Sequence, residues 1–205
     1  MALKDFLYRC PYCGRDPLEG VGDEARCGSC RRRYRRGTEP RGIQVIEDDG
    51  ESEEVSARHL GDRIRELDGD LEAEGGSGGG VILEADVTAQ VAEVEEPIRY
   101  RGALLGFVER AGPELSGTLR VTGRELQFVP DDGAARQWSL LDVRALQTAS
   151  ASVQISSVEG GVVTFAFSGD SPKRWEETLK RLLRRSWREE GRGEIFEFQP
   201  RIRAR

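Results

Sequence analysis

Histidine and long apolar runs are the scarcest features of this 205-residue sequence. The longest apolar stretch, VVTFAF, is much shorter than the roughly 18 to 20 residues that a transmembrane helix needs. The first residues, MALKDFLYRC, lack the apolar core and the small-residue cleavage site of a signal peptide. We therefore expect a cytoplasmic protein, and the inner face of the membrane is the one membrane position that we consider.

The sequence motifs of catalysis are also missing. His59 is the single histidine, and no paired carboxylate or nucleophile is placed around it, so we interpret it as a surface residue. The stretch EGGSGGG at 74–80 lacks the Lys-Ser/Thr of a phosphate-binding loop, which favours a flexible linker. Without a nucleophile elbow or a dinucleotide loop, the chain is predicted to be non-catalytic and to have no small-molecule substrate.

Charge is unevenly distributed along the chain. Residues 1–46 carry a net charge of +4, residues 47–96 carry −14, and residues 97–205 carry +4. The acidic middle is typical of a solvated linker. A chain of this length forms one large domain or two smaller ones, and the charge pattern favours two modules at the ends.

All four cysteines lie within 21 residues, as Cys10-x2-Cys13 and Cys27-x2-Cys30. Two such pairs about 15 residues apart are a strong zinc signature, because each turn directs two thiolates at one point. Gly14 and Gly28 are expected to supply the permissive backbone that the turns need. Four sulfur ligands fill the shell of Zn²⁺ and leave no position for an activated water, so the predicted zinc is structural.

Two other interpretations of the cysteines have less support. A pair of disulfides requires an oxidising compartment, and the expected cytoplasmic location is a reducing one. A thioredoxin-like redox pair requires a preceding strand in a βαβ unit, and neither pair has one. A metal also explains how so short a segment folds, since about 45 residues bury too little apolar surface alone.

Residues 1–46 are expected to form a small ribbon with strands in LYRCPYC, EARCGSC and GIQVIED. The pattern YRCPYCG…ARCGSCRRRY…RGIQVIEDD resembles rubredoxin-like zinc ribbons and the small ribbons that activate partner enzymes such as methyltransferases. This resemblance covers residues 8–48. It implies a ribbon fold with a structural zinc and specifies little about function.

An arginine cluster directly follows the last cysteine. One interpretation is an anion patch, since guanidinium groups suit nucleic acid or acidic lipid. The other is a solvated ribbon edge that discourages strand pairing, with its charges divided between two faces by strand alternation. The cluster consists of Arg31, Arg32, Arg33, Arg35 and Arg36.

Residues 47–80 are expected to be an acidic, partly helical linker that ends in the glycine-rich stretch. Apolar residues with 3-4-3-4 spacing predict a short helix over 53–73, which is too short for a coiled coil. The sequence leaves open whether this helix packs or stays free. Its apolar positions are Ala57, Leu60, Ile64, Leu67 and Leu71.

Residues 81–193 change to a period of two, which predicts antiparallel strands. Apolar residues alternate from Val81 to Val91, and further strands are expected in YRGALLGFVE, SGTLRVT, ELQFVP, RQWSLLDVRAL, SVQISSV and VVTFAFS. The intervening AGPELSG, TGRE, PDDG and VEGG carry turn residues. Short strands at this spacing favour a barrel or a sandwich. Residues 194–205 are expected to be a basic tail or an extra edge strand.

One helix is expected after the strands, with Ser171 as its N-cap, Pro172 first and Gly191 at its end. Its apolar side, which contains Trp175, is expected to close the barrel. The alternative is a lipid-contacting helix with a basic face. The basic residues are Lys180, Arg181, Arg184, Arg185 and Arg188.

A small barrel closed by one C-terminal helix resembles the pleckstrin-homology (PH-like) superfamily. Within it, SGTLRVTGRELQFVP…RQWSLLDVRAL…VVTFAFSGDSPKRWEETLKRLL is similar to the GRAM branch, over about residues 98–190. The resemblance implies a domain that binds phospholipid headgroups or protein segments and is rarely catalytic. Around the first hairpin, where the family has a basic pair, this chain has Arg99, Arg101 and Arg110 among acidic residues, so specific phosphoinositide binding is not expected.

The predicted fold class is therefore mainly β with small α content: a zinc ribbon plus a PH-like antiparallel β-barrel with a C-terminal helix. We expect a non-catalytic adaptor that docks a protein partner, with an anionic membrane surface as a candidate location. One alternative is nucleic-acid binding through the arginine cluster. A second is an activator subunit of a partner enzyme, and this alternative leaves the barrel unexplained.

Overall fold

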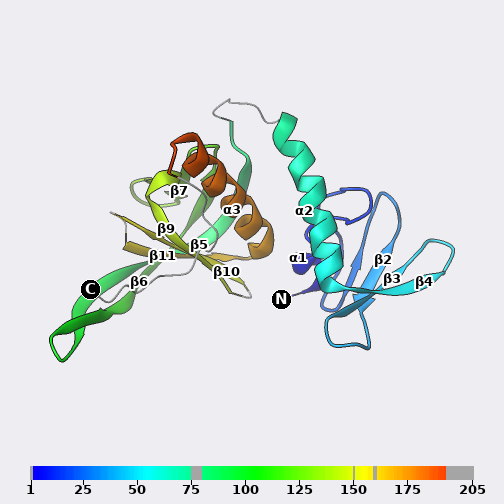
Figure 1. The fold of residues 1–205 in the computed structure, drawn as a ribbon, viewed down its shortest axis with the longest axis horizontal. Helices are drawn as coiled ribbons and strands as arrows, with labels where there is room; N and C mark the ends of the chain where they lie inside the picture. Colours follow the sequence, from blue (N-terminus) through cyan, green and yellow to red (C-terminus); the bar gives the residue numbers. More distant parts are fainter. Residues whose placement is uncertain (1, 75–79, 150, 159–160, 193–205) are drawn as a thin grey trace. The chain divides into compact units, whose positions relative to one another are not determined.

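The computed structural model describes residues 2–74, 80–149, 151–158 and 161–192. They belong to two compact units, Met1–Gly78 and Gly79–Arg205, which we call unit 1 and unit 2 (Figure 1). The tail 194–205, expected to be basic or an extra edge strand, lies outside the described residues. Each unit contains one antiparallel sheet and its own buried apolar cluster.

Unit 1 is built on a four-stranded sheet in the order β1-β2-β3-β4. Its strands are β1 (Glu24–Arg26), β2 (Arg33–Arg36), β3 (Gly42–Ile46) and β4 (Ser52–Ser56). Ala25, Tyr34 and Val45 are opposite one another in register and are buried, so alternation gives this sheet one core face and one outer face. The strands expected in EARCGSC and GIQVIED are confirmed.

The start of unit 1 differs from the expected strand in LYRCPYC. A short helix, α1 (Leu3–Phe6), precedes the first cysteine pair, and no strand forms over residues 7–13. Leu3, Leu7 and Tyr8 are buried in the apolar cluster of the unit. Their spacing of four and five residues suits a helical turn that places both leucines on one side, which explains why a strand does not form here.

The acidic segment contains regular structure that belongs to unit 1. Residues 52–56 pair with β3 as strand β4, and helix α2 (Ala57–Glu74) therefore begins at residue 57 instead of 53. Leu60 is 0% exposed and Ile64 is 2% exposed, and both belong to the same apolar cluster as Cys10 and Cys27. The first half of α2 thus packs against the cysteine-bearing unit.

Unit 2 is a single curled sheet of seven strands in the order β8-β7-β6-β5-β11-β10-β9 (Figure 1). The first four strands form one meander and the last three form another, joined where β11 pairs with β5. Strand β7 (Glu125–Pro130) matches the expected ELQFVP. The remaining strands are β5 (Leu83–Tyr100), β6 (Ala103–Val121), β8 (Arg136–Ser139), β9 (Val143–Thr148), β10 (Ser152–Ser157) and β11 (Gly161–Phe167).

The expected turn in AGPELSG is wrong, because these residues lie inside β6. The chain turns at Arg101 and Gly102, both with positive φ, so β5 and β6 form a long hairpin that extends beyond the other strands (Figure 1). Pairing of β6 with β7 starts at Gly117. Pro113 therefore lies where β6 has no outer neighbour, and its missing N–H breaks no ladder on that side.

The segment RQWSLLDVRAL, expected as one strand, is two strands joined by a 3₁₀ turn, η1 (Leu140–Asp142). The Ser139 hydroxyl accepts a hydrogen bond from the Leu141 N–H at 3.2 Å and caps this turn. The break separates β8 from β9, which are the two edges of the curled sheet.

Helix α3 (Pro172–Glu189) covers the concave side of this sheet, and its expected limits are confirmed. The Ser171 hydroxyl accepts from the Arg174 N–H at 3.2 Å, and Gly191 beyond the helix end has a φ of 66°. Trp175 is fully buried, and its indole N–H donates to Asp170 at 2.8 Å. The apolar side of the helix therefore completes the core of unit 2, together with Leu179, Leu182 and Leu183.

The mainly β fold class with a C-terminal helix over a curled sheet is confirmed. Among the described helices, none combines the length and the apolar character needed to span a bilayer.

Candidate metal centre

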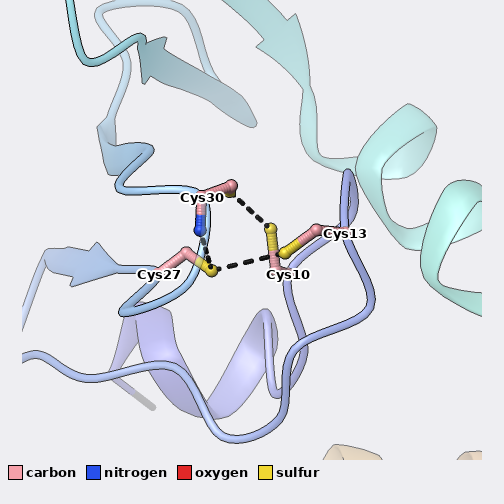
Figure 2. A group of neighbouring side chains, drawn as sticks. All are labelled: Cys10, Cys13, Cys27 and Cys30. Carbon is pink, nitrogen blue, oxygen red and sulfur yellow. Dashed lines mark hydrogen bonds between the residues drawn. The ribbon is translucent and has the colours of Figure 1, made fainter.

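The four cysteines converge at one point in unit 1. Cys10 and Cys13 come from one loop and Cys27 and Cys30 from another, and the side chains point toward each other (Figure 2). All four sulfurs lie within 4.8 Å of one another. The Sγ–Sγ distance is 3.5 Å both for Cys10–Cys30 and for Cys13–Cys27. These distances are close to the edge of about 3.8 Å in a tetrahedron with 2.3 Å metal–sulfur bonds.

The two cysteine turns have the same backbone hydrogen bonds. The Cys10 N–H donates to the Arg15 carbonyl at 2.9 Å, and the Gly14 N–H donates to the Cys10 carbonyl at 3.0 Å. In the second turn, the Cys27 N–H donates to the Arg32 carbonyl at 2.9 Å, and the Arg31 N–H donates to the Cys27 carbonyl at 3.0 Å. The repeated five-residue turn explains why two Cys-x2-Cys segments present their thiols alike.

Glycine is required in only one of these turns. Gly14 has a φ of 72°, as expected, and the equivalent position of the second turn is Arg31 with a φ of 62°. The expected role of Gly28 is wrong, since its φ is not positive and a Cβ there would make only an ordinary contact with Glu19. The second turn thus places a non-glycine residue in the left-handed region, which has a conformational cost.

The protein environment shifts the pKa values of the thiols in different directions. Burial raises the pKa of Cys10 to about 12, although hydrogen bonds from neighbouring groups act in the opposite direction. Burial also raises the pKa of Cys27. Burial opposes ionisation of Cys13 too, but the Arg15 N–H and the neighbouring thiols outweigh it and lower its pKa to about 7. A bound cation would favour the thiolate form of all four.

Tyr34 is a contact of the centre that the sequence did not reveal. It lies on β2, is 1% exposed, and its Oη is 3.1 Å from Cys10 Sγ. Burial, and then the adjacent Cys10 sulfur, raise the pKa of Tyr34, so the phenol keeps its proton. It can donate this proton to a Cys10 thiolate and partly compensate the buried negative charge.

Tyr12 connects the first cysteine turn to α2. The guanidinium carbons of Arg32 and Arg63 lie 4.3 and 4.2 Å from the centre of its ring. The Tyr12 hydroxyl donates to Glu53 at 3.1 Å, and Arg63 Nε donates to the Pro11 carbonyl at 3.2 Å. Residues on β4 and α2 therefore hold the loop between Cys10 and Cys13.

Most of the predicted arginine patch is engaged in ion pairs within unit 1. Arg31 pairs with Asp48 at 3.3 Å and Arg32 with Glu47 at 2.7 Å. Two further pairs are Arg35–Glu24, at 2.8 Å, and Arg36–Asp23. Arg33 is exposed on the outer face of β2. The alternation predicted for this run is present, with Tyr34 directed into the core.

The basic residues of α3 are distributed between ion pairs and solvent. Lys180 pairs with Glu176, and Arg185 pairs with Glu189 at 3.6 Å. Arg181 donates to Thr178 at 3.3 Å, and Arg184 and Arg188 are exposed. At the tip of the β5–β6 hairpin, Arg99, Tyr100 and Arg101 are exposed, and so is Arg110 farther along β6. His59, on α2 of unit 1, is also exposed, as expected.

Comparisons with known proteins identify no family. No protein-family model matches the chain, and no curated protein matches it significantly.

Proposed function

We propose that the chain is a non-catalytic adaptor, with a zinc-stabilised ribbon as unit 1 and a PH-like module as unit 2. The observation that carries this proposal is the closed group of four sulfurs. An ion bound by all four has no open position for substrate or water, so its effect is on folding.

Zinc is the metal that the donor set favours. Four thiolates at tetrahedral spacing suit Zn²⁺ or an iron–sulfur centre, whereas calcium and magnesium require oxygen ligands. Two turns with the same backbone hydrogen bonds hold the sulfurs. Tyr12 ties the first turn to Glu53, and the Tyr34 hydroxyl lies 3.1 Å from Cys10 Sγ. Native mass spectrometry tests this assignment: one zinc per chain supports it, and metal-free protein or Cys–Cys bridges contradict it.

Unit 2 supports the docking part of the proposal through its architecture. A four-stranded and a three-stranded meander with a helix in the concavity agree with the PH-like resemblance of the sequence. The helix residues Trp175, Leu179, Leu182 and Leu183 are all in the core, so no large apolar side chain of that group is left for lipid. Contact with an anionic membrane would depend on the exposed cations, each worth about 1 kcal/mol.

Two measurements separate the parts of this proposal. The first is affinity capture from native lysate, done with the full chain and with a chain that carries serine at the four cysteine positions. It tests whether a protein partner needs folded unit 1. Vesicle flotation at low salt tests the membrane part. Equal binding to anionic and neutral vesicles would remove the membrane from the proposal and leave protein docking intact.

The nucleic-acid alternative has weaker support, because four of the five arginines of the patch already face carboxylates. Binding DNA or RNA would require these pairs to open or to be shared. A steep loss of affinity with salt that disappears when the five arginines are changed to serine would favour this alternative. The activator-subunit alternative predicts a co-purifying enzyme in the same capture experiment.

A further inference from the structure

The outer face of the unit 1 sheet contains two arginines directly opposite each other. Arg26 on β1 and Arg33 on β2 are register partners, and both are exposed. Their neighbours Ala25 and Tyr34 point into the core, so both guanidinium groups are on the outer face. Like charges in this position repel and destabilise the strand pair.

These two arginines differ from the rest of the basic run. Arg31, Arg32, Arg35 and Arg36 each pair with a carboxylate. Within the part of the chain that the structure describes, neither Arg26 nor Arg33 has an ion-pair or hydrogen-bond partner for its guanidinium. The sheet therefore has two cations side by side without an ion-pair partner, although Glu19, the bridge partner of Arg26, lies nearby.

A concavity of about 360 Å³ adjoins the two arginines. Its lining includes Arg26, Arg33, Val21 and Ile46, with Glu19 and Glu24 at the same site. Glu24 is already bound to Arg35 at 2.8 Å. The concavity thus combines two available guanidinium groups with apolar surface and two acidic side chains.

Val21 is exposed because the local backbone fixes it there. It is 87% exposed and lies between Gly20 and Gly22, both with positive φ. A Cβ at Gly20 would lie 2.2 Å from the Glu24 carbonyl oxygen, so only glycine permits the loop to pass so close to β1. The Gly22 carbonyl also accepts the Leu3 N–H at 2.7 Å. An apolar side chain is thereby presented beside the arginine pair.

We propose that this concavity binds a segment of the partner protein that carries one carboxylate next to an apolar side chain. Arg26 and Arg33 would donate charge-assisted hydrogen bonds to the carboxylate, and Val21 and Ile46 would contact the apolar neighbour. A single carboxylate relieves the repulsion between the arginines. Glu19 and Glu24 would face the adjacent phosphates of a polyanion, which disfavours nucleic acid or a lipid surface. This inference rests on the proposed adaptor function.

The test uses the full chain purified with its metal and two capped pentapeptides. One has a central glutamate between leucines, and the other has glutamine in its place. Titration followed by NMR of the arginine Nε–H groups should give at least about tenfold tighter binding of the glutamate peptide. The double variant Arg26→Gln/Arg33→Gln should lose this preference, and Arg58→Gln, an exposed arginine of α2, should keep it.

Equal binding of the two peptides, or a preference that survives in the double variant, overturns the inference. A short single-stranded oligonucleotide that binds the same two arginines more tightly than the peptide also overturns it, in favour of nucleic acid. Val21→Ser provides a second readout and should weaken the leucine-flanked peptide but not an alanine-flanked one. If the double variant still captures a partner from lysate, this site is wrong while the adaptor function stands.

Discussion

Removal of the proposed metal is expected to unfold unit 1 and to leave unit 2 folded. Among the described residues, the buried cluster of unit 1 has twelve members, and two of them, Cys10 and Cys27, are candidate ligands. In the part of unit 2 that the structure describes, the buried cluster has nineteen residues and includes Phe128, Phe165 and Trp175. We therefore expect the smaller core, which contains two of the candidate ligands, to depend on the metal and the larger apolar core to be independent of it.

The expected size of the effect is comparable to the whole stability of a small domain. A structural zinc site contributes about 10–16 kcal/mol of apparent binding energy at pH 7. The net free energy of unfolding of a whole domain is about 5–15 kcal/mol. Helix α2 should unfold with the sheet, because its buried residues Leu60 and Ile64 belong to the same cluster and most of the stability of a helix in a protein comes from the packing of its apolar face.

Hydrogen exchange with mass spectrometry measures both outcomes in one sample. After treatment with a strong chelator, amide protection should fall over residues 2–74 and persist over 80–149, 151–158 and 161–192. Chelator already saturated with zinc is the matched control and should change neither unit. Metal analysis must first show that less than about a tenth of an ion per chain remains. If the amides of unit 1 are still protected in that sample, the reasoning is refuted. A protected α2 beside an unfolded sheet would also refute it.

Three further predictions concern single residues. Arg31→Gly should give metal-loaded unit 1 a free energy of unfolding up to about 1 kcal/mol higher than Arg31→Ala, measured by thermal unfolding. Both variants lose the ion pair with Asp48, and only glycine removes the left-handed strain, so a less stable glycine variant would contradict the turn geometry. Trp175→Ala should destabilise unit 2 by about 3–5 kcal/mol in denaturant titration and leave the metal content unchanged. Burial opposes ionisation of Glu176, but Lys180 and Lys173 outweigh it and lower the pKa of Glu176. The ionised Glu176 carboxylate thus stabilises unit 2 above the ordinary carboxyl pKa of 4.5, and this contribution is lost as the pH falls below that value. Denaturant titrations at pH 7 and pH 3 should therefore give a smaller loss of unfolding free energy for Glu176→Gln than for the unchanged chain.

Local patterns predicted the parts of the structure that local chemistry determines. The spacing of Cys10, Cys13, Cys27 and Cys30 implied a single four-sulfur group, because each turn is short enough to fix its own pair. The capping sequence at Ser171 and Pro172 gave the start of α3, since an N-cap satisfies backbone groups within one turn. Alternation gave strand β7 with its observed limits.

Other features depend on neighbours that are distant in sequence. AGPELSG was interpreted as a turn because Gly112 and Pro113 disfavour strands, yet β6 runs through them where β7 is absent. The segment EEVS was assigned to a helix, and it forms β4 because β3 offers it a free edge. Neither neighbour could be inferred from the local residues.

The contacts around the sulfurs were also missed, and only one had a signal in the sequence. Tyr34 follows Cys30 by four residues, and strand alternation placed it opposite its arginine neighbours, which indicates an inward position. Tyr12 lies between two ligands, and its contacts with Arg63 and Glu53 come from elements that the sequence assigned to a linker. A long-range partner was needed to recognise its role.

The expected dependence of unit 1, but not unit 2, on a metal provides a way to dissect the proposed adaptor function. Changing any of the four cysteines is expected to remove the surfaces of unit 1 together, because β1, β2, β4 and α2 contribute to one apolar cluster that contains Cys10 and Cys27. The Arg26–Arg33 face is outside that core, so its substitution removes one surface without unfolding the unit. Binding that is lost in a cysteine variant but kept in the arginine variant therefore belongs to another face of unit 1, and binding kept in both belongs to unit 2.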